Sequence, residues 1–122
     1  MKAKNVTMGI KSLREGLKDF SDTFKALQNG EQVQPKSEGI YFTDFEAFRK
    51  AMTPQRFALL KMIRERHPDS ISCLAGLTGR NIKNVSEDVK ALMNLGLLEV
   101  SQTGKNKAPY LRYEKILVEL AV

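Results

Sequence analysis

Side chains suited to binding nucleic acid gather in two short segments of this sequence. The first runs from Arg80 through residues 81–90 (NIKNVSEDVK), and the second is residues 101–109 (SQTGKNKAP). Lysine can contact phosphate or a guanine edge, asparagine can bond bidentately to adenine, and a helix N-terminus suits phosphate. The candidate DNA contacts are Arg80, Asn81, Lys83, Asn84, Ser86, Glu87 and Lys90 in the first segment, and Lys105, Asn106, Lys107 and Arg112 in or beside the second.

The sequence contains no grouping of residues that predicts catalysis or metal binding. His67 is the only histidine and Cys73 the only cysteine, so one chain cannot supply a usual metal cluster. Neither G-x-x-x-x-G-K-[ST] nor G-x-S-x-G occurs. His67 is expected at a helix end, where a cation suits the helix dipole, and Cys73 in core packing rather than in a thiol switch. We therefore predict neither an enzyme nor a bound cofactor or metal.

The charge balance and the single cysteine narrow the partners and the compartment. The 122 residues carry a formal net charge of +6, which favours an anionic partner such as nucleic acid, an acidic protein or a membrane face. One cysteine allows no internal disulfide, which fits a reducing compartment. No apolar run approaches the ~20 residues that span a bilayer, and the N-terminus lacks the pattern of a secretory signal. We predict a cytoplasmic protein.

A helix over residues 81–95 must position the first candidate segment. At ~100° per residue its apolar side chains fall on one side and its polar ones on the other. Asn81 can cap this helix and Gly96 can end it. The apolar side is Ile82, Val85, Val89, Leu92 and Met93, expected to dock on Phe57, Leu60, Ile63 and Leu74. The opposite side is Lys83, Ser86, Glu87, Lys90 and Asn94, with Asn84 on a flank.

The elements around this helix follow a recognisable order. Thr53-Pro54 predicts the start of a helix that ends before Pro68. That helix is followed by a short extended piece with a cap at residues 70–72, a short helix at 73–77, the Thr78-Gly79-Arg80 turn and the helix over 81–95. A strand at 97–100, the basic turn at 101–109 and an extended segment at 110–120 complete the order. This order is that of a winged helix-turn-helix, in which the basic hairpin is the wing. The predicted fold class is α+β, mainly α.

The first 39 residues predict a strand-helix arm joined by a linker. Residues 6–10 are expected to form a strand, a capping box at Ser12 opens a helix ending near Gly30, and residues 31–39 have the composition of a linker. The helix carries one apolar stripe: Leu13, Leu17, Phe20, Phe24 and Leu27. The stripe either covers the winged helix of its own chain or forms a dimer arm, and we predict the dimer. The remaining domain, residues 40–122, begins with a strand at 40–42 and a helix opened by Thr43.

The segments TPQRFALLKMI and SISCLAGLTGRNIKNVSEDVKALMNLGLLEV resemble winged-helix transcriptional regulators with a MarR-like fold. A smaller group of predicted regulators, often interpreted as antitoxins, is similar over nearly the whole chain. The resemblance implies a dimeric DNA-binding repressor that can autoregulate its own operon, with a toxin as a potential partner. Ser86-Glu87 departs from the family, which often has His or Arg there, whereas Asp88-Val89-Lys90 is kept. Asp88 is expected to pair with a neighbouring basic side chain.

Two functions therefore stay open. The first is a regulator that reads duplex DNA with residues 81–95 and the basic wing. The second is a protein-interaction module or antitoxin that binds a partner and binds DNA weakly or not at all. Glu87 favours the second, because an outward carboxylate repels phosphate, although it could accept from a cytosine amino group. The sequence indicates no ligand pocket, operator or effector.

Overall fold

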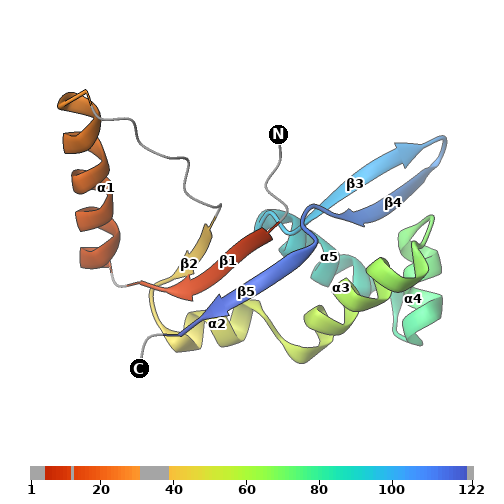
Figure 1. The fold of residues 1–122 in the computed structure, drawn as a ribbon. Helices are drawn as coiled ribbons and strands as arrows, with labels where there is room; N and C mark the ends of the chain where they lie inside the picture. The colour runs from red at the N-terminus through yellow and green to blue at the C-terminus, as the bar shows by residue number, and fades with distance from the viewer. Residues whose placement is uncertain (1–4, 12, 31–38, 121–122) are drawn as a thin grey trace. The chain divides into compact units, whose positions relative to one another are not determined.

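The computed structural model describes residues 5–11, 13–30 and 39–120 (Figure 1). The elements in chain order are β1 (Asn5–Ile10), α1 (Leu13–Gln28), β2 (Gly39–Phe42), α2 (Phe45–Ala51), α3 (Pro54–Arg66), α4 (Ile71–Thr78), α5 (Ile82–Asn94), β3 (Leu98–Thr103), β4 (Asn106–Leu111) and β5 (Lys115–Glu119). They form two compact units, one of residues 51–114 and one of the residues on either side of that span. The mixture of helices and strands confirms the predicted α+β class.

The unit of residues 51–114 is a winged helix-turn-helix whose helices start and stop at local signals. The Thr53 hydroxyl accepts from the Arg56 amide at 3.2 Å, and Pro54 occupies the first turn of α3. Gly79 ends α4 with a φ of 67°, a left-handed conformation that glycine adopts without steric cost. The Asn81 side chain accepts from the Lys83 amide at 2.8 Å and opens α5. These caps confirm the expected start of α3, end of α4 and start of α5.

One predicted element of this unit is wrong. The sequence predicts an extended piece at residues 70–72, but α4 already begins at Ile71. The Ser70 hydroxyl accepts from the Cys73 amide at 2.9 Å, which makes Ser70 an N-cap. The apolar residues after it are therefore held in a helix and not in a strand.

The core of this unit is the shared interior of its three helices and the root of the hairpin. The fully or nearly fully buried side chains are Met52, Leu59, Leu60, Ile63, Leu74, Ala75, Val85, Val89, Leu92, Leu97 and Leu98. The predicted docking of α5 is thus correct for Val85, Val89 and Leu92. It is wrong for Ile82, which is 51% exposed, and Met93 and Phe57 also keep much of their surface in solvent. Ile82 is the first residue of α5. It lies on the apolar side of the helix, but at this end of α5 there are no longer side chains of other elements to pack against it.

The hairpin of β3 and β4 is antiparallel, with a register that runs from Leu98 opposite Leu111 to Thr103 opposite Asn106. The two residues between the strands are Gly104 and Lys105, so the turn is shorter than the predicted turn over residues 101–109. Gly104 has a φ of 64°. A glycine with positive φ at the first turn position is typical of two-residue hairpins, whose twist matches that of the strands.

The second unit contains a three-stranded sheet in the order β2-β1-β5, and both pairings are parallel. Val6 and Met8 alternate onto one face of β1 and are completely buried. The extended segment predicted at residues 110–120 consists of two strands in different sheets, because β4 pairs with β3 and β5 pairs with β1. The pairing of β5 with β1 places both ends of the described chain in this unit.

The helices of this part of the chain have the predicted positions. α1 covers residues 13–28, and Gly30 follows it with a φ of 76°. Ser12, the predicted cap of α1, and the side chains of Leu13 and Leu27 lie outside the described residues. The cap of α2 is Asp44 and not Thr43, since an Asp44 carboxylate oxygen accepts from the Ala47 amide at 2.7 Å. Within the described segments, no helix combines the length and apolar content that a bilayer crossing requires.

Candidate nucleic-acid interface

The outward side of α5 carries the polar residues predicted for it. Lys83, Asn84, Glu87 and Lys90 are exposed, and Ser86 is half-buried. The opposite side is fixed by the buried Val85, Val89 and Leu92. Asn81 is exposed, but its side-chain oxygen is occupied in capping α5. The helix therefore presents a continuous polar surface whose first turn has its backbone amides directed outward along the helix axis.

Asp88 joins three elements of the helix-turn-helix through two arginines. One carboxylate oxygen accepts from Arg56 Nε of α3 at 3.1 Å, and the other accepts from Arg80 Nη2 of the turn at 2.8 Å. The side chains of Arg56, Arg80 and Asp88 are 22%, 23% and 14% exposed. Arg56 also donates from Nη1 to the Ala51 carbonyl at 2.7 Å. This cluster confirms the expected pairing of Asp88 and fixes the rotation of α5 about its axis.

Arg80, predicted as a phosphate contact, is thus placed in an internal ion pair and not on the open face of α5. Arg56 has no role in the site predicted from the sequence. Its bond with Asp88 spans 32 positions of the chain, so periodicity within one helix could not indicate it.

The residues predicted to contact DNA from the wing lie at two separate places on the hairpin. Lys105, Asn106 and Lys107 are exposed at the tip, whereas Arg112 follows the last residue of β4 at the root. The Arg112 amide donates to the Leu97 carbonyl at 3.2 Å, and its guanidinium lies 5.7 Å from the centre of the Tyr113 ring. At ~3.4 Å per residue the two places are about 20 Å apart. The tip is the part of the wing that concentrates cations.

A groove of about 390 Å³ lies between α5 and the wing. Its polar lining comes from Ser86 and Lys90 on α5 and from Gln102 and Lys107 on the hairpin. Its apolar lining is Ile71, Val89, Met93 and Val100. Ser86 and Lys90 of α5 and Lys107 of the wing come from the two separate segments predicted from the sequence, and the groove places them on one surface. Sequence reasoning missed Gln102, although it stands opposite Lys107 in the hairpin register.

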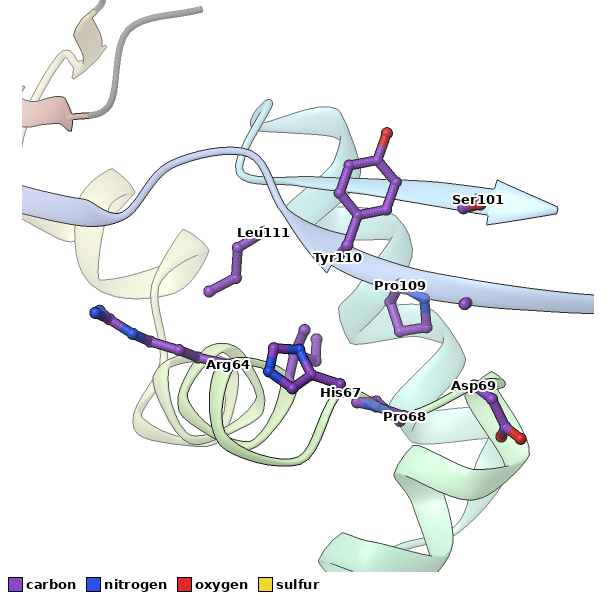
Figure 2. A pocket seen from close by; sticks show the side chains of 10 residues that line it. Arg64, His67, Pro68, Asp69, Ser101, Pro109, Tyr110 and Leu111 are labelled. Atoms are coloured by element: carbon purple, nitrogen blue, oxygen red, sulfur yellow. The ribbon is translucent and has the colours of Figure 1, made fainter. Parts of the chain in front are cut away.

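A second hollow, of about 410 Å³, lies between the end of α3 and the other side of the hairpin. Figure 2 shows Arg64, His67 and Pro68 at the end of α3 on one wall and Pro109, Tyr110 and Leu111 of β4 on the other. Arg64 donates from Nη1 to the Glu114 carbonyl at 2.8 Å, and the Tyr110 hydroxyl donates to Glu99 at 2.6 Å. His67 has a φ of 48°, the left-handed conformation of a helix C-cap. No local pattern in the sequence indicates this hollow, because its walls are distant along the chain.

Within the described residues, no group of three or more His, Cys, Asp or Glu side chains could hold a metal ion. Cys73 is a half-buried free thiol in α4. Arg64 and His67 line the second hollow, and neither is a residue that the sequence singles out for catalysis. The side chains of α5 and the wing that could bind a ligand are hydrogen-bond donors and cations.

A family model named HVO_A0114 matches residues 51–118, more than half of the chain. This name carries no activity, and the MarR-like resemblance remains a prediction. A similar solved structure is the homodimeric winged helix-turn-helix DNA-binding domain (fragment 1–100) of Mb0332 from Mycobacterium bovis, a possible ArsR-family transcriptional regulator. It is 19% identical, with a TM-score of 0.49 over 85% of this chain and 75% of that chain. A comparison with curated proteins gave no match. The winged-helix assignment rests on the order and pairing of the chain's own elements.

Proposed function

We propose that this chain, which belongs to the HVO_A0114 family, is a transcriptional regulator that binds duplex DNA with α5 and the wing. The observation that carries the proposal is the groove between these elements, where Lys90 of α5 and Lys107 of β4 line one hollow. Cations on both walls suit the phosphodiester strand that separates a major groove from the adjacent minor groove. α5 and the wing can then occupy those two grooves.

The geometry of α5 supports major-groove reading. The major groove of B-DNA is about 12 Å wide and admits one helix. Because Val85, Val89 and Leu92 hold one side of α5 in the core, only the side of Lys83, Asn84, Ser86 and Glu87 can meet base edges. The Asp88 cluster sets which of these side chains points furthest outward. In this proposal Asn84 reads a base edge, and Lys83 and Lys90 contact phosphate.

The wing supplies phosphate contacts in the proposal. Lys105 and Lys107 flank the tip, where their ammonium groups can approach a backbone or a minor groove. Together with Lys83 and Lys90 they give four cations per chain on this side. Neutralising four phosphates predicts a slope of log K against log salt of about −3.6 per chain. For one bound chain, affinity should then fall about 150-fold between 50 and 200 mM salt.

A direct test measures fluorescence anisotropy of a labelled duplex from the region upstream of the protein's own gene. The double variant Lys83→Ala and Lys105→Ala should weaken binding at least tenfold, because one cation is removed from α5 and one from the wing. Lys61→Ala, an exposed lysine of α3, is the matched control and should leave binding unchanged. If the double variant binds as the wild type does, the site on α5 and the wing is wrong.

The finer role that we propose is a repressor of its own operon, as the sequence resemblance implies. A repressor that occupies its own upstream region should prefer that duplex over a shuffled duplex of the same composition. Equal affinity for both duplexes would leave DNA binding intact but remove the autoregulatory role.

A second candidate function is a protein-interaction module, of the antitoxin kind. The observation that favours it is Glu87, which is exposed in the middle of the polar side of α5. A carboxylate there opposes phosphate and suits a basic protein partner. If no duplex binds at 50 mM salt, this second function leads. A toxin encoded by a neighbouring gene would then be the first partner to test by co-purification.

A further inference from the structure

α1 carries an apolar stripe that stays open to solvent in the described part of the chain. Leu17, Phe20 and Phe24 are 60%, 71% and 52% exposed, and the two phenylalanine rings are stacked with centres 6.4 Å apart. Three large apolar side chains on one line of a surface helix mark an interaction site, since single exposed apolar residues are common but contiguous ones are not. The stripe therefore needs a partner surface.

The base of α1 is anchored to its own sheet by a different side of the helix. Lys11, which follows β1, donates to Asp19 at 2.5 Å and lies 4.1 Å from the centre of the Tyr41 ring. At 3.6 residues per turn, Asp19 lies about 130° around the helix from the middle of the Leu17, Phe20 and Phe24 stripe. The anchored side and the apolar side thus face different directions. While this ion pair holds, the stripe cannot pack on the sheet of its own chain.

One face of the sheet has large apolar side chains that are partly exposed to solvent. Side chains alternate along a strand, so Thr7 and Gly9 of β1, Tyr41 of β2 and Leu117 of β5 share the face opposite the buried Val6 and Met8. We name this the outer face. Tyr41 is 46% and Leu117 52% exposed there. A side chain added at Gly9 would meet the Tyr41 ring at 3.2 Å, so the Tyr41 ring lies against Gly9 on this face. Parallel sheets are normally covered on both faces. On the outer face of this sheet Gly9 is buried, whereas Tyr41 and Leu117 remain about half exposed.

We propose that the apolar stripe of α1 packs on the outer face of the sheet in a second copy of this chain, and that the second copy returns the same contact. The exposed parts of the stripe amount to roughly 350 Å² and those of the outer face to roughly 250 Å². The reciprocal arrangement removes about 1,200 Å² from water, which reaches the range of stable interfaces. Pairing two α1 helices with each other removes only about 700 Å² and leaves the outer face open.

This arrangement deepens the proposed function, because a two-fold dimer presents two copies of α5 to two half-sites. It can be tested without DNA, so its failure and the failure of DNA binding are separate results. By sedimentation or light scattering at micromolar concentration, the full chain should have twice its 13.8 kDa mass. Phe20→Glu with Phe24→Glu should give the monomer mass, and so should Leu117→Glu. The control Lys18→Glu, which changes charge on the far side of α1, should stay dimeric.

A cross-linking experiment identifies the contact even where a charged variant fails to fold. Phe24→Cys and Leu117→Cys are made separately in a Cys73→Ser background, mixed, and treated with a short bismaleimide. The mixture should give a cross-linked dimer, and neither variant alone should give one. A dimer from Phe24→Cys alone would show helix-to-helix pairing and overturn the proposal. A chain that carries both Phe24→Cys and Leu117→Cys tests whether α1 folds onto its own sheet. A cross-link within one chain of that double variant would show that it does, and would also overturn the proposal.

Discussion

Replacing Asp88 tests whether the cluster around it holds α5 in place. Asp88→Ala removes the bonds of 3.1 Å from Arg56 and 2.8 Å from Arg80. A hydrogen bond between charged groups contributes ~1.5–3 kcal/mol to stability, and side chains 14–23% exposed belong near the lower end of that range. The two bonds therefore predict a decrease of about 3 kcal/mol in the free energy of unfolding. Removing the carboxylate also leaves two half-buried guanidinium groups close together.

The assay is urea unfolding followed by circular dichroism, with a thermal melt as a second measure. A decrease of about 3 kcal/mol should lower the melting temperature by on the order of 10 °C. Glu87→Ala is the matched control, because it removes an adjacent carboxylate from the exposed side of α5 and should change stability by less than ~0.5 kcal/mol. Asp88→Asn keeps an acceptor oxygen and should be destabilised about half as much as Asp88→Ala. Equal midpoints for Asp88→Ala and Glu87→Ala would refute the structural role of the cluster.

Three further outcomes are expected. Glu87→Gln should raise affinity for duplex DNA about threefold in the anisotropy assay, since a carboxylate ~7 Å from a phosphate costs about 0.6 kcal/mol in a water-like dielectric; a lower affinity would instead mean that Glu87 accepts from a base. Gly104→Ala should lower the free energy of unfolding by about 1 kcal/mol, because its φ of 64° disfavours a side chain although space is open, and an unchanged urea midpoint would contradict this. The hydrogen bond to Asp19 is the main cause that raises the pKa of Lys11 above its ordinary value of 10.5, so this ion pair is fully formed at neutral pH and breaks as pH rises through the folded-state pKa. An NMR titration of Lys11 should have its midpoint above pH 10.5, and a midpoint at the ordinary value would count against the anchor.

Local signals made most of the winged helix predictable from the sequence. Thr53, Asn81 and Gly79 act through neighbours close in the chain, and the spacing of Val85, Val89 and Leu92 selects the buried side of α5. Periodicity shows which side of a helix is apolar but not where its packing partners end. The exposure of Ile82 is the consequence.

Interactions between distant segments were the part that sequence reasoning could not supply. The pairing of β5 with β1 joins the two ends of the chain, and nothing in the local pattern of either strand indicates it. The bond from Arg56 to Asp88 and the groove between α5 and the wing depend equally on the tertiary arrangement. The local pattern therefore does not give the grouping of the predicted site residues, as the internal pairing of Arg80 and the position of Arg112 at the wing root illustrate.

The salt dependence of DNA binding tests the central claim most directly. The claim is that Lys90 and Lys107, on opposite walls of one groove, both bind phosphate. Removing either lysine should reduce the steepness of log K against log salt by about 0.9, because one fewer phosphate is neutralised. The double variant Lys90→Ala and Lys107→Ala should therefore have a slope about 1.8 shallower per chain than the wild type, while Lys61→Ala keeps the wild-type slope. A double variant with the wild-type slope would contradict the account.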